Sequence, residues 1–323
     1  MSLRQTTNEP MTGAASAAPV TARPPSWKRK YALHRGEPLA GFALIAPTVI
    51  GLGVFILWPA AQTLFFSFTK QGTFSGYTWI GIQNFVDIFG DPVFYGALIN
   101  TAVLTGFTIA AVPIAIVCAV LLNTEGLRAL TLYRVIYFLP VVTLPTAVGL
   151  VWKYLYNGDY GLLNSALAVV GIDGPSWLSD SRFVLVAVSM VAIWSTLGYN
   201  IVLLLAGLQS IPKSYYEAAE LDGAGKIRTF FTITVPLLTP TTFFVMIISV
   251  IGALKTFDLV YLMVGADNPA LGSARTILYL FYERGFTQFN GGYAAAIALV
   301  TLVIIGVVTL VQFRLQKKWV HYE

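Results

Sequence analysis

Residues 217–240 read EAAELDGAGKIRTFFTITVPLLTP, and this stretch decides how the rest of the chain is interpreted. Its first half carries five charged residues and two glycines, and apolar runs long enough to cross a membrane lie on both sides of it. A polar insert between two such runs is a place where a membrane protein can present a folded segment to water. The meaning of the insert therefore depends on the topology of the whole chain.

The composition is that of an integral membrane protein. Of 323 residues 56% are hydrophobic and 11% are charged, with a mean hydropathy of +0.72, whereas soluble domains carry roughly 25% charged residues. Six runs contain no Asp, Glu, Lys, Arg or His, and each has the roughly 18 residues or more that a helix needs to span the hydrocarbon core. These runs are Leu39–Phe68, Ala97–Leu122, Val135–Trp152, Phe183–Leu208, Leu237–Leu254 and Tyr293–Phe313. We predict an all-α membrane protein with six transmembrane helices.

The positions of Lys and Arg predict the orientation of these helices. One face of the predicted topology, which includes both termini, receives 14 of them and the opposite face receives six. By the positive-inside rule the richer face is cytoplasmic, so both termini and the insert lie in the cytoplasm. The net charge of +5 then follows from topology, and it does not indicate a nucleic-acid partner.

Three domains follow from this topology. We expect residues 1–36 to form a disordered basic tail near lipid headgroups, residues 37–313 to form the six-span domain, and residues 314–323 to form a second cytoplasmic tail. The outward connections are long enough to fold as short helices and turns on the outer face.

The insert itself has the signals of a helical hairpin, which we place at about residues 212–240. Ser214 and Glu217 fit a capping box that would start a helix near Tyr215, and Asp222-Gly223 would end it. A second short helix from Ala224 would carry Ile227, Phe230 and Phe231 on one stripe, with Pro236 and Pro240 fixing how the chain enters the fifth span. From the residues alone, an amphipathic segment on the membrane surface is an open alternative.

The insert also resembles a known motif. The pattern EAAxxDGAxxxxxFxxIxxPxxxP is similar to the EAA coupling loop of binding-protein-dependent ABC import permeases. The matching positions are Glu217, Ala218, Ala219, Asp222, Gly223, Ala224, Phe230, Ile233, Pro236 and Pro240. Segments such as 77–85, 160–164, 207–212 and 257–261 resemble the carbohydrate-uptake branch, of the maltose and glycerol-phosphate type.

The resemblance implies a type I importer permease fold in a bacterial cytoplasmic membrane, and a transport subunit that is not itself an enzyme. The implied partners are a second homologous permease in a heterodimer, two cytoplasmic ATPase subunits, an extracytoplasmic solute-binding protein and a sugar. ATP and magnesium would bind to the ATPase subunits, so no cofactor or metal is expected in this chain. Glu217, Gly223 and the other matched loop residues would contact the ATPase.

The substrate path is expected in the fourth and fifth spans, which flank the insert. Hydroxylated solutes need hydrogen-bonding side chains and aromatic faces. Ser195, Thr196, Asn200, Ser249 and Thr256 are the polar candidates, with Trp194, Tyr199 and Tyr261 as aromatics. By similarity to the maltose-type site, the candidates are Trp194, Leu197, Gly198, Ile201, Ser249, Ala253 and Thr256. Uncharged spans favour a neutral sugar or oligosaccharide over a strongly anionic cargo.

Other function classes are less well supported. Gly223-Ala-Gly-Lys226 fails the nucleotide-binding pattern GxxxxGK[ST], because Glu220 replaces the first glycine and Ile227 follows the lysine. A six-helix secondary transporter or channel is the main alternative, although such carriers usually place ionisable groups within their spans. An intramembrane enzyme is a third possibility, disfavoured by the missing acid–base constellation.

Overall fold

The computed structural model describes residues 37–71, 76–124, 126 and 130–319. The predicted disordered tail at residues 1–36 and the last four residues of the predicted C-terminal tail lie outside this range. The chain divides into two units, one ending at Leu57 and one beginning at Trp58. In the first unit, α1 (Glu37–Leu52) is followed by the π-helical turn η2 (Gly53–Leu57). Most of its described apolar side chains are exposed, as lipid-facing helices require.

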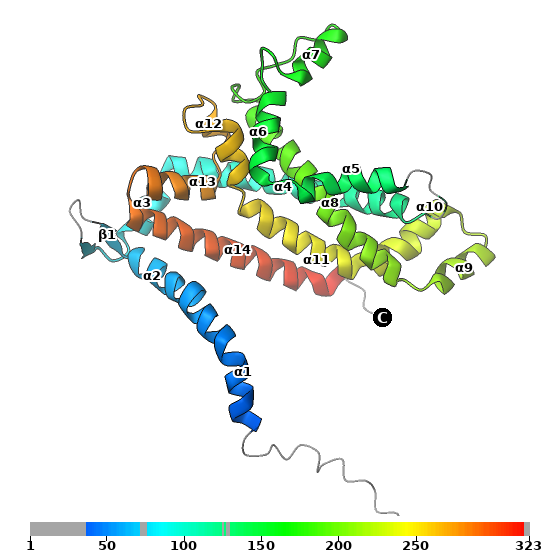
Figure 1. The fold of residues 1–323 in the computed structure, drawn as a ribbon, viewed down its shortest axis with the longest axis horizontal. Coiled ribbons are helices and arrows are strands. Elements are labelled where there is room, and N and C mark those ends of the chain that lie inside the picture. The colour runs from blue at the N-terminus through cyan, green and yellow to red at the C-terminus, as the bar shows by residue number, and fades with distance from the viewer. Residues whose placement is uncertain (1–36, 72–75, 125, 127–129, 320–323) are drawn as a thin grey trace, which may run out of the picture. The chain divides into compact units, whose positions relative to one another are not determined.

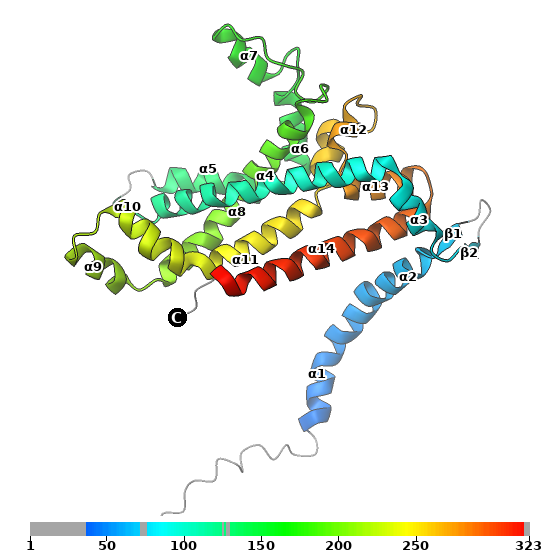
Figure 2. The same cartoon turned by 180° about the vertical axis from the view of Figure 1, so that it is seen from behind.

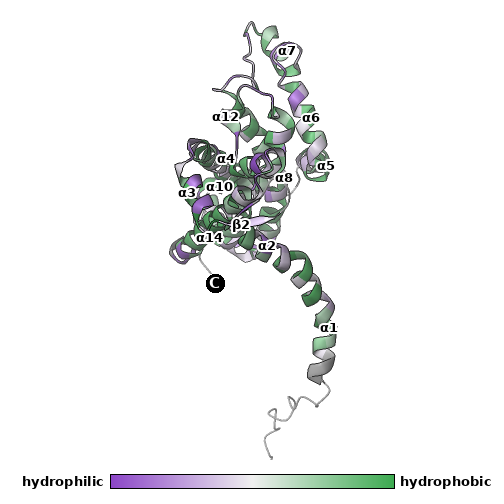
Figure 3. Cartoon of the chain, turned by 90° about the vertical axis from the view of Figure 1, so that its left-hand side faces the viewer, coloured by the Kyte–Doolittle hydropathy of each residue, from purple (hydrophilic) through white to green (hydrophobic). Residues whose placement is uncertain are grey.

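The second unit is almost entirely helical (Figure 1). Its longest helices are α4 (Pro92–Leu122), α8 (Val184–Ser210), α11 (Val235–Leu254) and α14 (Gly291–Trp319), and both views show them running along a common direction (Figures 1 and 2). Shorter helices are α2 (Trp58–Phe66), α5 (Leu130–Val142) and α6 (Pro145–Leu155). Figure 3 colours most of the helical surface green, the apolar end of its scale.

Within the described ranges, five helices are long and apolar enough to span a membrane, and a bent pair makes a sixth span if it is counted as one. The five correspond to predicted runs with small changes at their ends, and they are Gly41–Phe66, Pro92–Leu122, Val184–Ser210, Lys226–Leu254 and Gly291–Lys317. The last helix also continues past the predicted boundary at residue 313 as far as Trp319. The chain is therefore a multi-pass membrane protein.

The third predicted span is not one straight helix. Val135–Val142 and Pro145–Leu155 meet at a bend of 111°. Pro145 is the first residue of α6, and Leu144 before it is extended, with φ −60° and ψ 132°, because a residue that precedes proline avoids the helical region. The single run at 135–152 is thus corrected to two helices joined by a sharp break.

Buried apolar side chains join the long helices into a bundle. One cluster is built from α4, α8 and α11, and it includes Val112, Leu204 and Leu238, none of which is more than 1% exposed. A second cluster joins α4 and α14 to α3 (Gln83–Gly90) and α13 (Ile277–Tyr282). A third lies around the start of α8 and the short helices of the last connection. The helices that flank the 217–240 stretch are therefore firmly packed.

The connections at the other end of the bundle fold as predicted into short helices and turns. They include α3, α7 (Leu162–Val169), η4 (Val260–Val264), α12 (Leu271–Ala274), α13 and η5 (Glu283–Thr287). A small antiparallel pair of strands, β1 (Thr69–Gln71) and β2 (Tyr77–Trp79), was not predicted, and its register pairs Thr69 with Trp79. Strands of three residues are too short to show the alternation of polar and apolar residues by which a strand is predicted from sequence.

Candidate functional site: a protruding hairpin and a hydroxyl-lined cavity

The 217–240 stretch forms a hairpin at one end of the bundle, away from β1, α3 and α13 (Figures 1 and 2). Its first arm is α9 (Lys213–Leu221). The turn after it has two hydrogen bonds, one from Gly223 N to Glu220 O at 3.0 Å and one from Ala224 N to Ala219 O at 2.9 Å. Gly223 has φ +72°, so the pattern is a Schellman motif ending on a left-handed glycine. The predicted stop at Asp222-Gly223 is confirmed.

The predicted start of this arm was wrong. The helix begins at Lys213 with Pro212 as its N-cap residue, and no side chain caps it. Ser214 therefore lies inside the helix and forms no capping box with Glu217. Proline has a backbone conformation suited to a helix start and competes successfully with the serine signal.

The second arm is not a separate short helix. It begins at Lys226, two residues later than predicted, and runs through α10 (Lys226–Thr229) and the π-turn η3 (Phe230–Thr234) directly into α11. Pro236 lies in the first turn of α11, where its missing amide proton is not needed. This arm is therefore continuous with a spanning helix.

Two contacts brace the first arm against the second. The Tyr216 hydroxyl lies 3.2 Å from Thr234 Oγ1 in η3, and Tyr216 also packs against the apolar core of α4, α8 and α11. Ala219 is 8% exposed and therefore points inward. The hairpin is thus a folded extension of the bundle, and it is not a loose loop.

The outer surface of the hairpin is exposed and mixed in character. Of the residues predicted to contact an ATPase, Glu217, Ala218, Asp222 and Gly223 are exposed, Ala224, Phe230 and Pro236 are partly exposed, and Ala219 is buried. Three apolar side chains also face outward: Leu221 is 89% exposed, Ile227 is 77% exposed and Phe231 is 65% exposed. Leu221 was not predicted as a contact residue, since its apolar character is ordinary for a helix end. Exposed apolar side chains beside charged ones are typical of a protein–protein contact.

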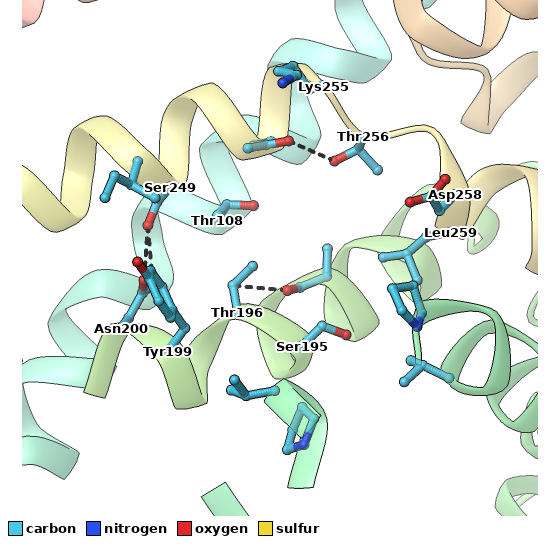
Figure 4. Close-up of a pocket in the computed structure, with 18 of the residues that line it drawn as sticks. Thr108, Ser195, Thr196, Tyr199, Asn200, Ser249, Lys255, Thr256, Asp258 and Leu259 are labelled. Carbon is cyan, nitrogen blue, oxygen red and sulfur yellow. Dashed lines mark hydrogen bonds between the residues drawn. The ribbon is translucent and has the colours of Figure 1, made fainter. Parts of the chain in front are cut away.

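A cavity of about 500 Å³ lies between α8, the end of α11 and the α5–α6 break (Figure 4). Asn200 and Ser249 lie together at one side of it, with Asn200 Nδ2 donating to Ser249 Oγ at 3.2 Å. Thr108, Thr143, Ser195, Thr196 and Thr256 add further hydroxyls. Most of these bond backbone carbonyls, as Thr196 does with Ala192 O at 2.9 Å. Within the part of the chain that the structure describes, the buried Ser195 Oγ has no partner.

The structure separates the predicted substrate-path residues into two groups. Asn200, Ser249 and Thr256 line the cavity, and so do Ser195, Thr196, Tyr199 and Ala253. The other candidates lie outside its lining and have packing contacts, and they are Trp194, Leu197, Gly198, Ile201 and Tyr261.

The candidates outside the cavity lining pack against other parts of the protein, and Gly198 is the clearest example. A Cβ atom added there would collide with the backbone carbonyl oxygen of Tyr137 in α5, so this glycine permits the close crossing of α5 and α8. Ile201 is 2% exposed in the core between α4, α8 and α11. Trp194 packs edge-on against Trp152 with ring centroids 5.5 Å apart.

Charged residues at the cavity were not predicted as site residues. Lys255 and Asp258 lie just beyond α11 and contribute to the lining, together with Phe257 and Leu259. Pro140 and Pro145 contribute from the broken helix.

Comparison with known proteins gives these features a context. The profile of the family described as binding-protein-dependent transport system inner membrane component matches residues 111–321. A probable ABC transporter permease, YesP of Bacillus subtilis, is 37% identical over 297 residues, covering 90% of this chain and 94% of the relative. The arabinooligosaccharides transport system permease AraP of the same species is 30% identical, covering 94% and 96%.

Solved structures share the fold. A chain of a bacterial ABC transporter involved in import of the acidic polysaccharide alginate superposes with a TM-score of 0.78 at 22% identity, covering 87% of this chain and 96% of that one. These matches favour the importer over the secondary transporter or channel alternative. The chain belongs to the binding-protein-dependent transport system inner membrane components, the permease subunits of ABC importers.

Proposed function

We propose that this permease subunit carries a carbohydrate through the cavity at Asn200 and Ser249. We further propose that a cytoplasmic ATPase binds the hairpin and drives this transport. The observation that carries the proposal is the closed, exposed turn at the end of α9, braced to the first turns of α11 by Tyr216. Because α11 contributes Ser249 and Thr256 to the cavity, displacement of the hairpin can alter the cavity. One continuous helical path thus links the two sites.

We also propose an orientation of the chain in the membrane. The hairpin and both termini face the cytoplasm of a bacterial inner membrane, in agreement with 14 Lys and Arg on that side against six on the other. Six spans are completed by counting the bent pair α5–α6 as one. The opposite end, with α7, α12 and α13, then faces an extracytoplasmic binding protein.

The assembly contains two permeases and two ATPase subunits, and ATP and magnesium bind to the latter. Several apolar side chains beside the cavity are exposed in this chain, including Val141 at 43% and Val142 at 77%. A second homologous permease subunit that covers them would also close the open side of the cavity. We expect no cofactor in this chain itself.

The cargo is a neutral sugar or oligosaccharide. Hydroxyl and amide groups such as those of Asn200, Ser249 and Thr256 can exchange hydrogen bonds with sugar hydroxyls, and apolar walls cover the rest of the cavity. Lys255 and Asp258 offset each other in charge. Carbohydrate transport is also the role of a similar protein, since AraP belongs to an arabinooligosaccharides transport system.

Reconstitution of the four-subunit complex with its sugar-loaded binding protein tests the proposal. The wild type should hydrolyse ATP faster when the loaded binding protein is present. Glu217→Lys should abolish this stimulation while the complex still inserts, because a reversed charge at a docked surface costs several kcal/mol. Glu217→Gln, which keeps the shape and removes the charge, should give an intermediate loss. Full stimulation in Glu217→Lys would refute the docking role of the hairpin.

A further inference from the structure

The connection between α11 and α14 places a row of aromatic rings at the edge of the cavity. Phe257 lines the cavity, and its ring centroid lies 5.2 Å from that of Tyr261 and 5.0 Å from that of Tyr282. Tyr282 in turn stacks on Phe286 at 5.6 Å. We call these four residues, Phe257, Tyr261, Tyr282 and Phe286, the aromatic shelf. The connection that carries the shelf includes α12 and α13, which Figure 1 shows away from the hairpin arms α9 and α10.

The rings of the shelf are not buried as core residues are. Tyr261 is 42% exposed and Phe286 is 63% exposed, and Phe257 and Tyr282 are partly buried. A hydrogen bond with Tyr261 raises the pKa of Tyr282. Although neighbouring rings of the shelf cover part of each other, Tyr261 and Phe286 keep exposed ring surface that a ligand can contact.

The shelf is nevertheless held rigidly. Thr276 Oγ1 donates to Thr256 O at 2.7 Å, beside Phe257. Asn100 of α4 donates to the carbonyl oxygens of Gly272 and Arg275, each at 3.0 Å, which fixes α12 and the start of α13. A surface that is both exposed and fixed binds a ligand without a large cost in ordering.

The backbone adds a second sign of function. Tyr261 lies in η4 and Phe286 lies in η5, both of which are single π-helical turns. Such turns are rare and occur often at functional sites, since they re-aim side chains that a regular helix would direct elsewhere. Here both turns contribute rings to the same exposed row.

The chemistry of the shelf fits a carbohydrate. Sugar rings have apolar C–H faces that pack on aromatic rings and hydroxyl edges that need polar partners. Thr256 and Asp258, both in the cavity lining, supply polar groups next to the first ring of the shelf. A mixture of aromatic surface and a few polar groups is typical of small-ligand sites.

We propose that the aromatic shelf is an additional carbohydrate subsite, which holds the sugar unit that follows the one in the cavity. The inference rests on the proposed function, in which a carbohydrate passes through that cavity. Its consequence is a preference for oligosaccharides, because a single sugar unit in the cavity can contact Phe257 but not the outer rings, which lie outside the cavity lining.

The test first identifies the cargo. The cognate binding protein is titrated by calorimetry with arabinose, glucose and galacturonate series of one to three units. If it captures none of these saccharides, the proposed carbohydrate function fails, and the subsite fails with it. If it captures only monosaccharides, the proposed function stands and the subsite is refuted.

Transport of the captured series by the reconstituted complex then tests the shelf. Tyr261→Leu and Phe286→Leu keep an apolar side chain of similar bulk and remove the ring. Each should lower the transport rate of the trisaccharide about fivefold, the size of one aromatic contact, and leave the monosaccharide rate unchanged. Tyr261→Phe should retain trisaccharide transport. The matched control is Phe244→Leu, a 51% exposed ring of α11 outside the cavity lining, and it should transport both sugars normally.

Three results with these variants would overturn the subsite. Equal losses for the monosaccharide and the trisaccharide, or a loss of assembled complex in the leucine variants, would show that the rings stabilise the fold or anchor it at the membrane surface. Unchanged trisaccharide transport in both leucine variants would show that the rings do not touch the cargo.

Discussion

Replacement of Gly223 by alanine tests the turn on which the coupling proposal depends. Gly223 has φ +72°, and a Cβ atom added there meets nothing within 4 Å. The cost of the substitution is therefore that of the left-handed backbone alone, roughly 1–2 kcal/mol for an L-residue with a side chain. This lowers the ratio of closed to open turn by a factor of about 5 to 30.

Hydrogen exchange measures this change at the turn itself. The amide of Ala224 donates to Ala219 O at 2.9 Å when the turn is closed, so its exchange should accelerate by that same factor of about 5 to 30 in Gly223→Ala. Stimulation of ATP hydrolysis by the loaded binding protein should fall in parallel. Asparagine tolerates the left-handed conformation, so Gly223→Asn should recover much of both properties.

A neighbouring glycine supplies the control for this experiment. Gly225 has φ −68° and ψ 159°, which is ordinary extended backbone, and a Cβ atom there also meets nothing within 4 Å. Gly225→Ala should leave exchange at Ala224 and ATP hydrolysis close to wild type. If Gly223→Ala behaved like Gly225→Ala, or if Gly223→Asn were as damaging as Gly223→Ala, the argument from the left-handed turn would be refuted.

Two further predictions concern the bundle. The Asn200–Ser249 pair joins α8 to α11. A double-mutant cycle of Asn200→Ala and Ser249→Ala, measured by thermal unfolding in detergent, should give a coupling free energy of about 0.6 kcal/mol. A coupling free energy of zero would show that the hydrogen bond contributes nothing to stability. Gly198→Ala should destabilise the fold by about 1–3 kcal/mol, because the new methyl group overlaps a backbone carbonyl of α5, whereas Gly106→Ala, with open space at its Cβ position, should be neutral. A Gly198→Ala variant with normal stability and altered transport would instead favour its original assignment to the substrate path.

The spans could be predicted from the sequence because uncharged runs of sufficient length have few stable alternatives in a membrane. The break at 142–145 could not, since prolines such as Pro47 and Pro113 lie inside continuous helices of the same chain. Whether a proline bends a helix sharply depends on whether neighbouring segments satisfy the freed backbone groups. Those contacts belong to the tertiary structure, and the local sequence does not show them.

The hairpin shows a similar division. The glycine that ends α9 was predicted correctly because only a left-handed residue completes that turn. The start of α9 was missed because Pro212 and Ser214 gave competing local signals.

In the cavity, Asn200 and Ser249 were found by their polarity, whereas Gly198 was assigned to the substrate path although a neighbouring backbone occupies the space beside it. A sequence does not show which face of a buried helix meets a cavity and which meets another helix.

The central claim is that an ATPase subunit contacts the hairpin, and site-specific photo-crosslinking tests it most directly. The photoreactive residue p-benzoylphenylalanine replaces Leu221, which is 89% exposed on α9, or Val169, which is 86% exposed on α7. Figures 1 and 2 show α7 projecting from the bundle apart from the hairpin. In the assembled complex, position 221 should give an adduct with the ATPase subunit, and position 169 should give none with that subunit. An ATPase adduct from position 169, or its absence from position 221, would contradict the account.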